Sequence, residues 1–312
     1  GGVLIALMAL FKTYLGSIID DKVWKGIAEG LNYGLGFMVI FMLHFTVATK
    51  QPAMTAARFA EAVEKTPQGK TVNMKLAQLL VDVFRSQSIA VLGNVLIAMG
   101  LAALIAFGYQ YKTGEPLMNA DQIAYQLHSI DPFAGTLWFA AIAGVWLFCS
   151  GIISGYFDNR SNYLNMRMRL TQHPLLKKLM SEKTRVKFAN YMHENYGSLI
   201  GNLCFGMLLG ITGVVGYLTH LPLDIRHVAF SSANVGYIAV SGHFTYSLLL
   251  QCIGFVLLIG LVNLIVSFSL TLWVALRSLN AEIDSWWPIW HEVCQIVKKR
   301  PLSLFLPVQL DK

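Results

Sequence analysis

Long runs of apolar residues constrain this chain more than any other feature of its sequence. A helix needs roughly 20 consecutive apolar residues to cross the hydrocarbon core of a bilayer. Six runs meet or approach that length, at residues 3–19, 31–48, 88–109, 132–156, 197–218 and 245–276. Because a chain inside lipid must satisfy its own backbone polar groups, such runs form helices. We therefore expect an all-α fold: a polytopic membrane bundle of about six transmembrane helices.

The composition points to the same class. Hydrophobic residues make up 55% of the chain and charged residues only 13%, against roughly a quarter charged in an ordinary soluble domain. This balance excludes a disordered chain, a collagen and a typical soluble enzyme. The four cysteines form no CxxC pair and are expected to be buried apolar side chains: Cys149, Cys204, Cys252 and Cys294.

Two further segments are expected to associate with the membrane without crossing it. The apolar stretch 228–240 is too short to span, so it predicts a re-entrant or interfacial segment. The final segment, 277–312, combines three tryptophans with a basic cluster, at Trp286, Trp287, Trp290, Lys298, Lys299 and Arg300. That pattern is typical of an interfacial helix. We therefore expect a transmembrane domain at 1–276 and a cytoplasmic interfacial tail at 277–312.

The basic residues are unevenly distributed between the loops. Segments 49–87 and 157–196, together with the tail, hold 19 of the 24 lysines and arginines. With six spans these segments face one side, which the positive-inside rule assigns to the cytoplasm. Both ends of this sequence are then cytoplasmic. The basic face is expected to contact anionic lipid headgroups, and its charge also permits DNA as a partner.

The runs 88–109 and 197–218 share a pattern. Each contains a Gly-Asn pair, a methionine and a Gly-Tyr pair, and the matched positions are offset by 108 residues. The matched residues are Gly93, Asn94, Met99, Gly108 and Tyr109, then Gly201, Asn202, Met207, Gly216 and Tyr217. This predicts parallel hairpin repeats. Gly206 and Gly210 have small-xxx-small spacing, which favours helix packing within the chain over oligomerisation, and the oligomeric state is left open.

Polar residues inside the apolar runs are candidate functional positions. Lys12 is the one full charge within a predicted span, and it either has a function or pairs outward towards Asp20 and Asp21. Asn94 and Asn202 lie within two other spans. Because a buried amide in lipid needs a partner, each asparagine either joins helices or lines a polar pathway.

A second set of candidates lies just before the stretch 228–240. Asp224 and Arg226 lie two residues apart after Pro222 and can pair to anchor this loop, or they can bind a ligand together with His227. The spacing of His227 and His243 matches no zinc motif, so no metal site is expected. No nucleotide-binding loop, GxSxG elbow or HExxH motif occurs. We therefore assign no catalytic residue and no cofactor, and leave enzymatic activity undecided.

Three stretches of the sequence resemble a known family. They are HFTVATKQPAMT at 44–55, VFRSQ at 83–87 leading into Gly93-Asn94, and LPLDIRHVAFS at 221–231. Together they resemble the bacterial site-specific recombinase family of the Gcr type, over most of the chain. The resemblance implies the membrane-spanning C-terminal half of a longer protein, with a mostly helical soluble region before it as a partner. It also implies a bacterial inner-membrane location and a link to DNA recombination.

Three functions follow as expectations. The leading one is a membrane scaffold or transport-like module without a catalytic site. Recombinase chemistry needs a nucleophile among clustered cationic groups, and candidates such as Tyr163 and Ser181 have no clustered histidine in the sequence. The alternatives are a membrane-tethered DNA recombination factor and a true transporter that uses Lys12, Asn94, Asn202 and the loop 220–243 along a polar path.

Overall fold

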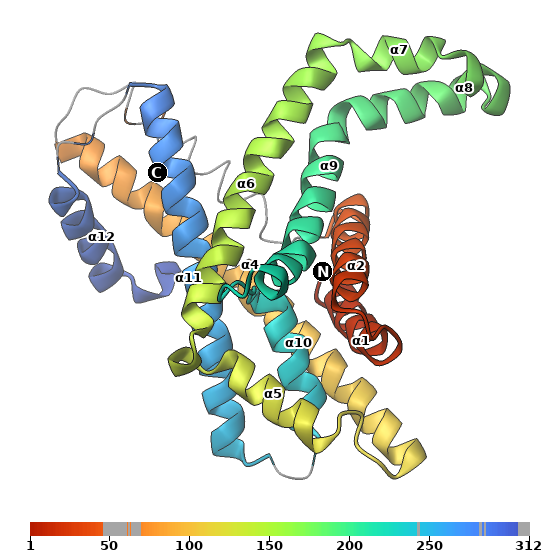
Figure 1. Cartoon of the computed structure of the whole chain (residues 1–312). Coiled ribbons are helices and arrows are strands. Elements are labelled where there is room, and N and C mark those ends of the chain that lie inside the picture. The colour runs from red at the N-terminus through yellow and green to blue at the C-terminus, as the bar shows by residue number, and fades with distance from the viewer. Residues whose placement is uncertain are drawn as a thin grey trace. The chain divides into compact units, whose positions relative to one another are not determined.

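The described residues are almost entirely helical. In this computed structural model they are residues 1–45, 61, 63, 70–241, 244–280, 283 and 285–304, and they contain no strand (Figure 1). The predicted all-α fold is confirmed. His243 and much of the predicted basic segment 49–87 lie outside the described residues. Two compact units are described separately: unit 1 is Gly1–Leu10, Thr46–Phe148 and Ile225–Lys312, and unit 2 is Phe11–Phe45 and Cys149–Asp224.

Four helices are long and apolar enough to cross a membrane. They are α4 (Lys70–Thr113), α6 (Thr136–Tyr163), α9 (Glu182–Thr219) and α11 (Tyr246–Ser278). In the most apolar windows of α4 and α11, only 28% of residues are buried inside the structure. Apolar surface exposed on this scale is unfavourable in water and suits contact with lipid. The predicted class, a helical membrane bundle, is confirmed.

The count of six spans stays a prediction. Helix α1 (Gly2–Ile18) has 17 residues, fewer than the four long apolar helices. Helix α2 (Lys22–Met42) is capped by the Asp21 carboxylate, and it carries Lys25 and Glu29 in its first half. Because α1 and α2 would add two crossings together, four and six spans give the later loops the same sidedness.

Helices α4 and α9 are longer than a bilayer core is thick. They contain 44 and 38 residues, which is about 66 and 57 Å at 1.5 Å per residue, whereas the hydrocarbon core is about 30 Å thick. The apolar runs 88–109 and 197–218 lie in their C-terminal parts. Their N-terminal parts therefore lie outside these apolar runs. The 108-residue repeat itself stays a prediction.

Unit 1 is built around α10 (Val228–Ala239), a short helix buried along most of its length. It packs against α4 and α11, and also contacts α5 (Ala120–Ile130). It meets α4 at Gly236, where a Cβ atom would collide with the Met99 carbonyl oxygen. The stretch predicted to be re-entrant is thus a buried helix, and its depth in a membrane stays a prediction.

The first part of the tail packs within unit 1. Helix α12 (Trp287–Lys299) packs against α4, and its Ile289 is buried in a cluster with Leu76 and Ala77 of α4. Trp287 remains exposed on the same helix. Within unit 1, α12 therefore has one face packed against α4 and one exposed aromatic surface. Its location at a membrane interface stays a prediction.

In unit 2, α2 packs against α9 along facing glycines. A Cβ atom on Gly206 would collide with the backbone of Gly34, and one on Gly210 with the backbone of Gly30. Gly26 continues the same four-residue spacing on α2 and meets Val214. Backbones can approach this closely only where no side chain intervenes. Gly206 and Gly210 of α9 are therefore used for packing within the chain.

Two short helices connect α6 to α9 within unit 2. They are α7 (Met166–Gln172) and α8 (Pro174–Leu179), and we call residues 164–181 the α7–α8 arm. Figure 1 shows α9 bent, with its first part running beside α7, and α7 contacts α9. Near the base of the arm, the Asp158 carboxylate accepts a 2.9 Å hydrogen bond from the Gly197 N–H. Neither α7 nor α8 contains a buried residue.

Candidate functional site

Polar groups of unit 1 meet at the start of α10. The Asn263 side chain of α11 donates hydrogen bonds to the carbonyls of Ala140 at 2.7 Å and of Arg226 at 3.0 Å. Its oxygen accepts a bond of 3.1 Å from the Val228 N–H. One buried amide thus joins α6, α11 and the first turn of α10. We call these four residues the Asn263 junction.

Arg226 holds the loop before α10 in place. Its Nε donates to the Ser129 carbonyl at 2.8 Å, and its backbone N–H donates to the Phe139 carbonyl at 3.2 Å. The guanidinium carbon lies 5.4 Å from the centroid of the Phe139 ring. These contacts tie the loop to α5 and α6, and they direct the arginine donors to backbone carbonyls. This is the geometry of an anchored loop.

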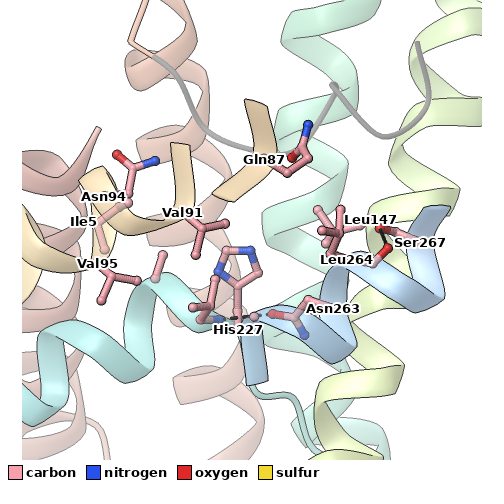
Figure 2. Close-up of a pocket in the computed structure, with 13 residues that line it drawn as sticks. Ile5, Gln87, Val91, Asn94, Val95, Leu147, His227, Asn263, Leu264 and Ser267 are labelled. Carbon is pink, nitrogen blue, oxygen red and sulfur yellow. Dashed lines mark hydrogen bonds between the residues drawn. The ribbon is translucent and has the colours of Figure 1, made fainter. Parts of the chain in front are cut away.

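A small cavity lies beside the Asn263 junction (Figure 2). Its volume is about 40 Å³, room for about three water molecules if each occupies about 10–15 Å³. The polar side chains along its wall are Gln87, Asn94, His227, Asn263 and Ser267, and the other lining residues are apolar or glycine. Two sequence candidates, Asn94 and His227, are therefore brought to one cavity, with Arg226 beside it in the chain.

His227 is the titratable group on the wall of this cavity, and it immediately precedes α10. Its ring is 6.0 Å from that of Phe230. Burial lowers the pKa of His227 to about 4, because the charged imidazolium loses its hydration when it is buried. The side chain is therefore neutral near pH 7 and shows no sign of serving as a fixed positive charge.

Lys12 belongs to a different polar group, in unit 2. Its Nζ lies 3.5 Å from Glu29 Oε2 and 5.6 Å from the centroid of the Tyr33 ring. Asp224 also interacts electrostatically with Tyr33. The sequence reasoning missed Glu29 as the partner. A signal existed, because Lys12 and Glu29 are nearly equidistant from the α1–α2 turn at Asp20-Asp21.

Asn202 lies on the buried face of α9. Its side-chain amide donates a 2.8 Å hydrogen bond to the Ser198 carbonyl, one turn earlier in the same helix. Asn202, Lys12 and Asp224 belong to unit 2, whereas Asn94, Arg226 and His227 belong to unit 1. The sequence candidates are therefore divided between the two units, and two of those in unit 1, Asn94 and His227, line the cavity described above.

One serine–histidine pair resembles part of a nucleophilic site. The Ser161 hydroxyl lies 3.1 Å from His193 Nδ1, a contact that the sequence reasoning missed because 32 residues separate the two. A serine nucleophile needs an adjacent base and access to its substrate. Ser161 is 0% exposed, so a DNA phosphate cannot reach its hydroxyl. Its contacts, including one to the His193 carbonyl at 3.2 Å, instead join α6 to α9.

The described part of the chain contains no group of three or more His, Cys, Asp or Glu side chains placed to hold a metal ion. Neither the comparison with curated proteins nor that with solved structures gives a match. The sequence profile of a family described as site-specific recombinase matches residues 1–307. Because this match covers nearly the whole chain, the chain belongs to the site-specific recombinase family.

Proposed function

We propose that this chain is a membrane-embedded scaffold of its family, without a catalytic site of its own. The observation that carries the proposal is the Asn263 junction. Its amide makes three hydrogen bonds to backbone groups of separate segments. A polar side chain engaged in this way stabilises the arrangement of helices, because each unsatisfied backbone group in an apolar interior is costly.

The size of the cavity favours a scaffold over a transporter. A volume of about 40 Å³ admits a few water molecules but no metabolite. The walls are mostly apolar, and Arg226 next to His227 directs donors to carbonyl oxygens of its own unit. These features support a packed interior and give no support to a polar path for a solute.

The same proposal includes a location and an orientation. We place the protein in the bacterial inner membrane with both ends of this sequence in the cytoplasm. The support is the excess of basic residues in 157–196 and in the tail, and the family to which the chain belongs. Further parts of the same protein would then be held at the cytoplasmic face by the scaffold.

Thiol accessibility tests the scaffold proposal. In protein lacking its native cysteines, Val91→Cys and Leu264→Cys place thiols on the cavity wall, from α4 and α11. A small water-soluble thiol reagent should leave both unmodified in the membrane and modify both after denaturation. The exposed Gln172→Cys in α7 is the control and should react in the native protein. Rapid modification of Val91→Cys in the native protein would favour a transporter instead.

Family membership favours one second candidate, a membrane-tethered DNA recombination factor. In that case the basic face should bind duplex DNA, with an affinity that falls steeply as salt rises. Purified protein in zwitterionic nanodiscs and a labelled duplex test this directly. Absence of binding at low salt would remove this candidate.

A further inference from the structure

We propose that the α7–α8 arm binds the surface of an anionic bilayer. The inference rests on the proposed membrane scaffold and adds the surface that this arm contacts. The first support is charge. Segment 157–196 carries eight lysines and arginines and three acidic residues. Two of the three carboxylates are engaged nearby, Asp158 with the Gly197 N–H and Glu194 with Arg167 at 3.4 Å. The arm therefore presents a net positive surface.

The second support is the exposed apolar surface of the same helices. Leu175 and Leu179 lie four residues apart on α8 and are 61% and 78% exposed. Lys177 and Lys178 lie between them in the sequence, and Met168 is exposed on α7. Basic residues beside leucines suit a lipid interface, where the leucines enter the acyl boundary and the lysines meet phosphates. The phosphates of a DNA duplex would pair with the lysines but would leave the leucines exposed to water.

The third support is where the chain must place the arm. The apolar run of α6 ends at 156, and the helix continues for seven residues to Tyr163. Those residues span about 10 Å, comparable to the headgroup layer, which is roughly 5–8 Å on each side of the core. On the other side, the bend in α9 keeps its first part beside α7 (Figure 1). The arm thus joins α6 seven residues beyond its apolar run, and it joins α9 fifteen residues before the run 197–218.

An environment-sensitive fluorophore tests the proposal. Leu179→Cys in the full chain, without native cysteines, is labelled and reconstituted in vesicles of phosphatidylcholine alone or with added phosphatidylglycerol. Because Leu179 is 78% exposed, the substitution should leave the fold intact. We expect a blue shift and quenching by lipid-borne spin labels in the anionic vesicles, reversed by high salt.

Charge variants separate this contact from simple membrane insertion. Lys177→Glu with Lys178→Glu should reduce about tenfold the fraction of protein whose labelled arm contacts the anionic bilayer. Lys112→Glu, at the far end of α4, is the matched control and should leave it unchanged. An unshifted spectrum in both vesicle types would overturn the proposal, as would a shift that appears only when duplex DNA is added. The scaffold proposal is tested by the accessibility of Val91→Cys, which is a separate measurement. A failure of the scaffold proposal can therefore be distinguished from a failure of the proposed arm contact.

Discussion

The side-chain amide of Asn263 donates a 2.7 Å hydrogen bond to the carbonyl of Ala140 and so ties α11 to α6 in unit 1. The same amide nitrogen and its oxygen reach Arg226 and Val228 at the start of α10. A Cβ atom on Gly144 would collide with the backbone and side chain of α11, which shows how closely the two helices approach there. The hydrogen bond from the Asn263 side chain and the close contact at Gly144 together hold α6 and α11 in this arrangement.

Asn263→Ala should lower the free energy of unfolding by about 2 kcal/mol, because two carbonyls and one N–H lose their buried partner. Thermal unfolding in detergent measures the change. Asn195→Ala is a matched control, since the Asn195 amide makes a 2.9 Å bond to Tyr191 within its own helix. The control should change stability by well under half as much. Equal effects from the two variants would show that the junction is not a special contact.

Gly206→Ala should destabilise unit 2. The new methyl group would collide with the backbone of Gly34, and moving two packed helices apart costs about 1–3 kcal/mol. Gly213→Ala on the same helix is the control, because no atom lies within 4 Å of the position of its Cβ. Alanine is the better helix former, so this variant should be neutral or slightly more stable. Melting temperatures of both variants in one detergent decide the point.

The length of the apolar runs was enough to predict the fold class and the four long apolar helices, whereas the charge bias indicates an orientation that stays a prediction. Both features act locally along the chain and need no knowledge of helix partners. The family was also recognisable from short stretches of sequence. The contact between the glycines of α2 and α9 could be predicted only in part. The spacing of Gly206 and Gly210 indicates a packing face on α9, but it does not identify the glycines of α2 as its partner.

The partners inside the candidate site could not be predicted. Arg226 bonds to the Ser129 carbonyl 97 residues away, and Asn263 bonds to Ala140 123 residues away. Such contacts depend on how the helices are arranged, because a side chain can donate to a carbonyl within a neighbouring helix, as Asn263 does to Ala140 of α6. A sequence such as Asp-Ile-Arg-His at 224–227 identifies polar side chains, but it does not show whether they face solvent, a ligand or the backbone of another helix.

Stability should depend on pH through His227. Its pKa is about 4 in the folded protein and about 6.5 when unfolded. Because the folded pKa is lower, the stability present above pH 6.5 is lost as the pH falls from about 6.5 towards 4, by up to about 3 kcal/mol. His227→Leu should remove this pH-dependent part of the stability, while the pH dependence that comes from the carboxylates stays the same. The test is the difference between wild-type and variant melting temperatures from neutral to acidic pH, which should shrink as the pH falls.

Lys12 and Glu29 should be energetically coupled. Their side chains are 38% and 14% exposed and their charged atoms lie 3.5 Å apart. We expect a coupling energy of about 1 kcal/mol in a double-mutant cycle with Lys12→Met and Glu29→Gln. Glu29→Gln alone should be the more harmful change if Lys12 then lacks a counter-ion in lipid. A cycle that sums to zero would show that the two charges act independently.

The orientation of the bundle gives the last prediction. Glu115 follows α4 and Met180 precedes α9, so one long apolar helix, α6, lies between them in the chain. If α6 crosses the membrane, Glu115→Cys and Met180→Cys lie on opposite sides, and the basic arm places Met180 in the cytoplasm. In cells, an impermeant thiol reagent should therefore modify Glu115→Cys only, and in inverted vesicles Met180→Cys only. Because α1 and α2 add either no crossing or two, this outcome holds for four spans and for six. Modification of both thiols from the same side would contradict a crossing by α6 and with it the assignment of the arm to the cytoplasmic face.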